Sequence, residues 1–162
     1  NADVVYMTSY APLFAHADGW QWTPDLIWFN NLKSYATPNY YVQKLFSNNK
    51  GTDILKIESN GKAVSGQEKL YATAVKDTKT HEIIIKIVNA DTQAKTVNIK
   101  PETLKIGKKV TKILLSAPQL SSENNFDAEP VKPKEENSEA KKGEISTEIP
   151  GNSLVVLKVK TI

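Results

Sequence analysis

Hydrophobic and polar residues follow two different patterns along this chain. Up to residue 46, apolar and aromatic residues stand in short continuous runs or at helical spacing. From residue 54 onward, apolar and polar residues alternate, with turn-forming segments between the runs. Short continuous runs are typical of strands buried on both faces, whereas alternation is typical of strands with one buried face. The chain is therefore predicted to contain two structurally different parts.

The first part, residues 1–51, predicts one strand, one loop and one helix. The apolar run at residues 26–30 (LIWFN) favours a short strand buried on both faces, and residues 4–15 favour a buried run that leads into a loop. A single βα unit cannot bury its own apolar surface, so it needs neighbouring strands. Without them, residues 4–46 are expected to fold back onto the second part, to pair with a second copy, or to stay partly disordered.

The predicted helix begins after Thr37, whose hydroxyl can cap the first turn, and Pro38 occupies the first helical position. Gly51 is expected to end the helix in the left-handed conformation. Apolar residues at three- and four-residue spacing form one stripe along this helix. They are Tyr41, Val42, Leu45 and Phe46.

The second part, residues 52–162, predicts a mainly β domain. About seven short strands joined by turns, with no helix between them, indicate an antiparallel, jelly-roll-like β-sandwich. Alternation is clearest at residues 82–89 and 153–160. The side chains expected on one face of these two strands are Ile83, Ile85 and Ile87, and Val155, Leu157 and Val159.

Residues 121–143 interrupt the alternation. This stretch is rich in Ser, Glu, Asn, Lys and Pro, and Phe126 and Val131 are its only large apolar residues. Such a composition is typical of a flexible surface loop. We therefore expect a mobile excursion from the sandwich, with Phe126 resting on it.

Composition excludes several functions. All 21 basic residues are Lys, and the absence of Arg argues against a nucleic-acid surface. The absence of Cys excludes disulfides and thiolate sites. No apolar run reaches the roughly 20 residues of a membrane span. His16 and His81 are far apart and lack neighbouring ligands, so neither a metal site nor a cofactor is expected.

Aromatic residues are concentrated at the front, where residues 1–46 hold eleven of the thirteen. Trp20 and Trp22 flank a turn, and Asp25 follows closely. Tryptophan faces stack on the C–H faces of sugar rings and a carboxylate accepts sugar hydroxyls, so this loop is a candidate sugar contact. The alternative is that these tryptophans only pack. The same region holds no Glu before residue 58, so no catalytic pair of carboxylates is expected in this chain.

Three segments of the first part closely resemble the α-L-arabinofuranosidases of glycoside hydrolase family 51. They are residues 3–15 (DVVYMTSYAPLFA), 22–30 (WTPDLIWFN) and 37–47 (TPNYYVQKLFS). The second part resembles the C-terminal domain of that family more loosely. The similarity there lies in the strand layout, in Phe126-Asp127 of the long loop, and in the closing segment PGNSLVVL.

This resemblance implies that the chain is the C-terminal piece of an enzyme made of a (β/α)₈ barrel and a β-sandwich. Such an enzyme removes terminal α-L-arabinofuranosyl residues from plant polysaccharides with retention of configuration, using two Glu that would precede this chain. Residues 1–51 would be the last strand–loop–helix unit of the barrel, with residues 20–25 at the sugar pocket. Trp20, Trp22 and Asp25 are then the expected substrate-binding residues, and the chain alone is expected to be inactive.

The resemblance also implies two partners: the rest of the barrel, and an arabinose-containing polysaccharide or oligosaccharide. An exported bacterial enzyme is expected, and a homo-oligomer stays open. Two rival interpretations remain. The sandwich could be a carbohydrate-binding module, although Tyr71 and Phe126 are its only aromatic residues. It could also be a structural or partner-binding domain, with a subunit interface on the face of Ile83, Ile85 and Ile87.

Overall fold

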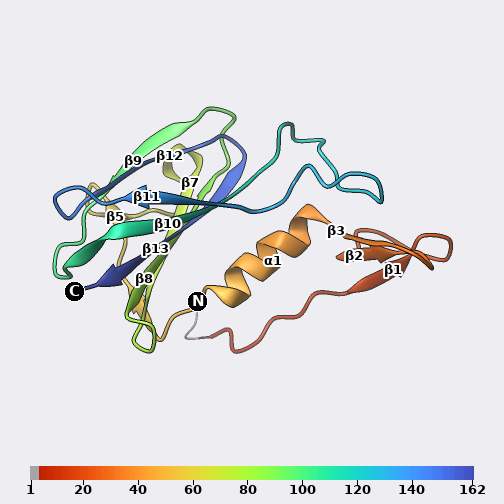
Figure 1. Cartoon of the computed structure of the whole chain (residues 1–162), viewed down its shortest axis with the longest axis horizontal. Coiled ribbons are helices and arrows are strands. Elements are labelled where there is room, and N and C mark those ends of the chain that lie inside the picture. Colours follow the sequence, from red (N-terminus) through yellow and green to blue (C-terminus); the bar gives the residue numbers. More distant parts are fainter. Residues whose placement is uncertain (1–3) are drawn as a thin grey trace.

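The computed structural model describes residues 4–162, so Asn1, Ala2 and Asp3, the first residue of the first matching segment, lie outside the described residues. Figure 1 shows three layers of a mainly β molecule and a small sheet at one end. A large antiparallel sheet lies between a two-stranded sheet and helix α1 (Pro38–Asn48). The expectation of an antiparallel β-sandwich is confirmed.

The large sheet has six strands in the order β11-β10-β13-β8-β7-β4, and every neighbouring pair is antiparallel. The facing sheet pairs β9 (Lys95–Ile99) with β12 (Ile145–Ile149). A short hairpin, β5 (Glu58–Ser59) and β6 (Lys62–Ala63), and a 3₁₀ turn, η1 (Gln67–Lys69), lie between β4 and β7. The six strands are β4 (Asp53–Leu55), β7 (Leu70–Asp77), β8 (Glu82–Asn89), β10 (Ile106–Ser116), β11 (Lys134–Glu139) and β13 (Ser153–Thr161).

The main core lies between the two sheets. The predicted inward residues of β8 and β13 are all buried there, against Ile145 and Ile149 of β12. The hypothesis of a subunit interface on Ile83, Ile85 and Ile87 is therefore wrong, because these side chains face the interior of the sandwich. Alternation identified this face correctly because each strand directs every second side chain inward.

A second core lies on the opposite face of the large sheet, under α1. Leu45 of the helix packs there with Ile84 of β8 and Val156 of β13, and Tyr41 and Val42 pack at its border. Of the three fates expected for the front segment, the structure shows folding back onto the sandwich for this helix. Because β8 and β13 are covered on both faces, their sequences IIIKIV and LVVLKV are nearly continuous apolar runs.

The start of α1 is as predicted, but its end is not. The Thr37 hydroxyl accepts a hydrogen bond from the N–H of Tyr40, and Pro38 is the first helical residue. The helix ends at Asn48 with Asn49 as its cap, and Gly51 is not left-handed. Position 51 requires glycine for another reason, because a Cβ atom there would lie 2.6 Å from the carbonyl oxygen of Lys76. No helix within residues 4–162 is long and apolar enough to cross a membrane.

The front segment also forms a three-stranded sheet, at the right of Figure 1. Its strands are β1 (Phe14–His16), β2 (Ile27–Phe29) and β3 (Ser34–Ala36). β2 is parallel to β1 and antiparallel to β3. The expectation that residues 26–30 are buried on both faces is wrong for this chain, since Ile27 and Trp28 are half-buried and Phe29 is exposed. A sheet this small has too few covering layers to bury both faces.

Residues 121–143 are not one continuous loop. Residues 134–139 form β11, which pairs with β10 along its whole length and is an edge of the large sheet. An edge strand with exposed faces needs no apolar residues, and this explains why its composition resembles that of a loop. Phe126 does not rest on the sandwich; its ring packs edge-on against Tyr35 of β3, 4.9 Å between centroids.

Candidate functional site

The three predicted sugar-contact residues lie around one cavity. Trp20, Trp22 and Asp25 all line a cavity of about 220 Å³ beside β1. Ligand pockets of about 300–1,000 Å³ accommodate drug-sized molecules, so a smaller one suits a single sugar ring. The remaining lining residues are Pro12, Phe14, Ala15, His16, Gly19 and Gln21.

Asp25 is the acidic residue of this cavity. It is 3% exposed, and within the described part of the chain its Oδ2 atom has no hydrogen-bond partner. Buried polar atoms are nearly always paired, and leaving one unpaired costs about 1–3 kcal/mol. An unpaired carboxylate oxygen of a residue that lines a cavity can accept a hydrogen bond from a hydroxyl group of a ligand.

The main chain around Asp25 is held from both sides. The N–H of Leu26 donates to the carbonyl of Pro12 (3.4 Å), and the carbonyl of Leu26 accepts from the N–H (3.1 Å) and hydroxyl (2.9 Å) of Thr37. The Thr37 hydroxyl also caps α1. Thr37, which caps the helix, therefore also fixes the peptide group between Leu26 and Ile27, one residue after Asp25.

The two tryptophans differ in how they are held. The Trp20 ring packs edge-on against Trp28, 5.9 Å between centroids, and Trp20 is 51% exposed. Trp22 is 64% exposed, so its ring is open to a ligand. An open indole face beside a carboxylate can stack on the apolar face of a sugar while the carboxylate accepts hydroxyls.

His16 has a structural part in the cavity wall. Its Nδ1 accepts a hydrogen bond from the N–H of Asp18 (3.2 Å), and its Nε2 lies 3.4 Å from Oδ1 of Asn31. An Nδ1 that accepts leaves the ring proton on Nε2, which then donates to Asn31. His16 therefore joins the loop after β1 to the turn after β2, and its ring packs edge-on against Phe29.

Sequence reasoning missed the contribution of β1. Pro12 and Phe14 reach the cavity because β1 runs parallel to β2, and this pairing joins segments that no local pattern connects. Asp25 is the only acid among the lining residues, so the cavity holds no pair of carboxylates. Across residues 4–162, no cluster of three or more His, Cys, Asp or Glu could hold a metal ion.

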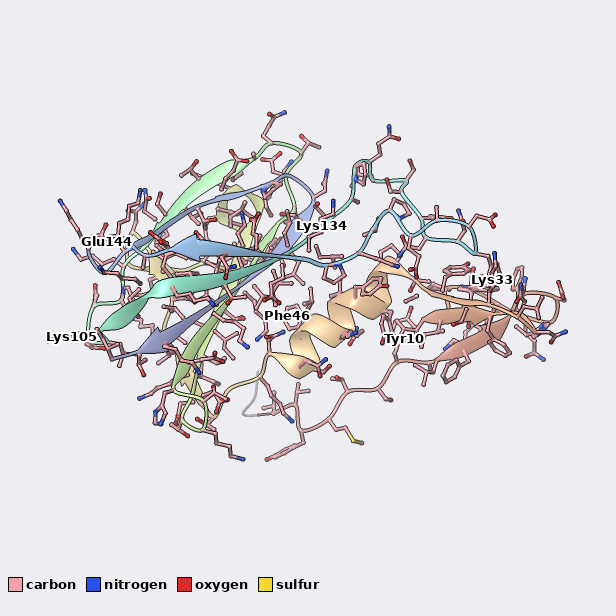
Figure 2. All side chains as sticks on the ribbon, in the orientation of Figure 1. Tyr10, Lys33, Phe46, Lys105, Lys134 and Glu144 are labelled. Atoms are coloured by element: carbon pink, nitrogen blue, oxygen red, sulfur yellow. The ribbon has the colours of Figure 1, made fainter. Side chains whose placement is uncertain are left out.

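A larger cavity, of about 460 Å³, lies in the sandwich. Glu144 is in its lining and pairs with Lys100 at 3.3 Å. Figure 2 places Glu144 at the end of the molecule remote from Lys33 and the three-stranded sheet. The lining residues are Ser138, Glu139, Lys141, Glu144 and Ser146, none of them aromatic, so this cavity offers no stacking surface.

Comparison with known sequences finds similarity to α-L-arabinofuranosidases. The profile of the family "Alpha-L-arabinofuranosidase C-terminal domain" matches residues 1–153. The chain is 58% identical over 55 residues to an extracellular exo-α-L-arabinofuranosidase of Streptomyces chartreusis, covering 34% of this chain and 7% of that protein. It is 32% identical to α-L-arabinofuranosidase 1 of Arabidopsis thaliana over 94% of this chain and 23% of that protein.

Comparison with solved structures also finds similarity to α-L-arabinofuranosidases. The arabinose-bound MgGH51 α-L-arabinofuranosidase superposes on the whole chain with a TM-score of 0.86 at 27% identity, over 25% of its own length. The arabinose complex of the Thermotoga maritima α-L-arabinofuranosidase shares the fold over 84% of this chain and 31% of its own length, with a TM-score of 0.72 at 21% identity. The chain thus spans about a quarter of the length of most of these relatives. With the profile covering nearly all of it, the chain belongs to the α-L-arabinofuranosidase C-terminal domain family.

Proposed function

We propose that this chain is the C-terminal part of a retaining α-L-arabinofuranosidase, in which the Asp25 cavity forms part of the wall that holds the arabinofuranosyl ring. Residues 1–51, which contain β1, β2, β3 and α1 and not the single strand expected from the sequence, belong to the end of its barrel, and the sandwich of residues 52–162 stabilises them. The observation that carries the proposal is the buried Oδ2 of Asp25, unpartnered within residues 4–162, in a residue that lines one cavity with the exposed Trp20 and Trp22.

Each residue has a separate task in this proposal. Asp25 accepts one or two sugar hydroxyls, and Trp22 stacks on the C–H face of the ring. Trp20, braced by Trp28, closes one side of the cavity. Bond cleavage requires two carboxyl groups on opposite sides of the glycosidic bond, and the cavity holds one carboxylate. The chemistry is therefore assigned to residues outside this chain.

The first test is binding by this chain. Its three tryptophans all lie within residues 20–28, so tryptophan fluorescence and the three indole N–H signals in NMR spectra report on the cavity and on Trp28, which packs against Trp20. We expect L-arabinose to shift the Trp20 and Trp22 signals. Asp25→Asn should reduce affinity about tenfold through the loss of a hydrogen bond to a charged group, and Trp22→Ala should reduce it by a similar factor through the loss of stacking. Tyr71→Ala, which changes an exposed aromatic residue of the sandwich, is the matched control. Absence of any response in the unmodified chain would overturn the assignment of the cavity.

The second test is activity. The chain alone should not hydrolyse an aryl α-L-arabinofuranoside, because it lacks the catalytic pair. Measurable turnover that persists through repeated purification would contradict the proposal.

The rival function, a carbohydrate-binding module, is tested with the same variants. Calorimetric titration with arabinan or arabinoxylan should give no binding once Trp22→Ala and Asp25→Asn are combined. Binding that survives both changes would place the carbohydrate site on the sandwich and favour the rival.

A further inference from the structure

One loop of the sandwich, residues 117–133, extends past α1 to the three-stranded sheet (Figure 1). It leaves β10 and returns into β11, so both of its ends are anchored in the large sheet. Its contacts with β3 come from three side chains: Asn124, Phe126 and Glu129. The loop therefore connects the sandwich directly to the sheet that carries the cavity.

Ala36, the last residue of β3, is held through both of its main-chain groups. Its N–H donates to Oε1 of Glu129 (3.1 Å), and its carbonyl accepts from Nδ2 of Asn124 (2.8 Å). Asn124 is 4% exposed and also bonds the N–H and the carbonyl of Val131, both at 2.9 Å. A buried amide with these hydrogen bonds has one orientation, so Asn124 and Glu129 take the place of a neighbouring strand.

The position of Ala36 affects the main chain at Asp25. Ala36 pairs with Ile27 of β2, and the next residue, Thr37, donates two hydrogen bonds to the carbonyl of Leu26. Leu26 directly follows Asp25. Displacement of Ala36 is therefore expected to displace Leu26 and, with it, the neighbouring residue Asp25.

A row of aromatic rings makes a second connection. Phe126 packs against Tyr35, and Tyr35 is the register partner of Trp28 across the β2–β3 pair. Trp28 packs against Trp20, which lines the cavity. The row leads from the sandwich loop to the cavity wall.

We infer that Asn124, Phe126 and Glu129 are positioning residues of the Asp25 cavity. They set the place of β2 and β3, and thereby the place of the Asp25 carboxylate and the Trp20 ring. None of the three lines the cavity, and their contacts with β3 are to Ala36 and Tyr35. The consequence for sugar affinity rests on the proposed function, but the coupling itself can be measured without any sugar.

The first experiment records the three indole N–H signals of the ligand-free chain. Asn124→Ala and Phe126→Leu are expected to displace the Trp20 and Trp28 signals, while the amide signals of β8 and β13 keep their positions. Leu120→Ala is the matched control, because this residue lies in the same loop and is 81% exposed, whereas Asp127 pairs with Lys33 next to β3 (3.8 Å). Unmoved indole signals in Asn124→Ala with an intact sandwich would overturn the inference. If Asn124→Ala does not fold, Phe126→Leu decides, since it keeps an apolar side chain in place.

Glu129 provides a rescue test. Glu129→Ala removes the acceptor for the Ala36 N–H and should displace the indole signals. Glu129→Gln keeps an acceptor oxygen at the same place and should restore them. Equal displacement in both variants would show that the hydrogen bond to Ala36 does not position the site.

Titration with L-arabinose separates this inference from the proposed function. Asn124→Ala and Glu129→Ala should bind about five- to tenfold more weakly, the factor that corresponds to one ordinary hydrogen bond. Glu129→Gln and Leu120→Ala should bind like the unmodified chain. If the unmodified chain does not bind, the proposed function fails and the ligand-free signals still decide the coupling. If every variant binds equally well, the positioning role is wrong and the proposed function stands.

Discussion

The ammonium group of Lys86, on β8, donates a hydrogen bond to the main-chain carbonyl of Asn49 at the end of α1. Lys86 is 6% exposed, and its Nζ lies 5.4 Å from the centre of the Phe46 ring, which Figure 2 shows on α1 near the large sheet. Unpaired carbonyls give a helix C-terminus a partial negative charge, which a cation stabilises. Lys86 therefore fastens α1 to the sheet.

Replacing Lys86 by alanine should destabilise the chain. The variant loses the packing of the aliphatic stem and leaves the Asn49 carbonyl without its donor, so we expect a decrease of about 2 kcal/mol in the free energy of unfolding. Lys44→Ala, at an exposed position of the same helix, should change it by less than about 0.5 kcal/mol. Urea unfolding followed by circular dichroism measures both, and equal effects of the two changes would contradict the role given to Lys86.

Low pH should weaken the contact between the loop of residues 117–133 and the three-stranded sheet. Burial raises the pKa of Glu129, but hydrogen bonds from Lys132 and from the Ala36 N–H outweigh burial and hold this pKa below its usual value. A carboxylate whose pKa is lowered by folding stabilises the fold above its unfolded pKa of about 4.3, and loses this contribution as the pH falls through the folded value. The free energy of unfolding should therefore fall more steeply below about pH 4.3 in the unmodified chain than in Glu129→Gln. Urea unfolding at a series of pH values tests this, and parallel pH profiles would speak against it.

Gly51 should not tolerate a side chain. A Cβ at this position would lie 2.6 Å from the Lys76 carbonyl oxygen and 2.8 Å from the Val75 side chain, and the main chain of β7 cannot give way easily. Gly51→Ala is expected to cost about 1–3 kcal/mol, as overpacking does elsewhere. Gly19→Ala is the control, because a Cβ there meets nothing within 4 Å. Thermal unfolding of the two variants gives the comparison, and a stable Gly51→Ala chain would be the contrary result.

Asp25 should favour binding at the expense of stability. Within residues 4–162 the carboxylate oxygen Oδ2 of Asp25 is buried without a partner, which is unfavourable until a ligand supplies one. Asp25→Asn should therefore raise the free energy of unfolding of the ligand-free chain by about 1 kcal/mol while it weakens sugar binding. Calorimetric unfolding with and without L-arabinose checks both effects. Loss of stability together with loss of binding would indicate a purely structural residue.

Local signals in the sequence identified the parts of the molecule that local interactions build. Thr37 and Pro38 mark the helix start because capping depends on residues within one turn. The alternation of β8 and β13 identified the inner face of the sandwich. Trp20, Trp22 and Asp25 fall within six positions of one another, so a single loop brings them to the same cavity.

Long-range contacts were not predictable in the same way. Asn124 is 88 positions from Ala36, and nothing in the polar composition of its loop shows that the side chain is buried. The parallel pairing of β1 with β2 depends on a crossover connection that no periodicity reveals. Gly51 was assigned to the helix end, whereas its small size is required by β7, a strand that comes later in the chain.

The composition of β11 has a protective consequence. The sequence KEENSE of Lys134–Glu139 lies along an open edge of the large sheet, and five of its six residues are exposed. A foreign strand that docked beside it would have to strip water from several charges without offering them partners. The polar residues of β11, whose composition resembles that of a loop, therefore disfavour edge-to-edge pairing between copies and the growth of β-fibres.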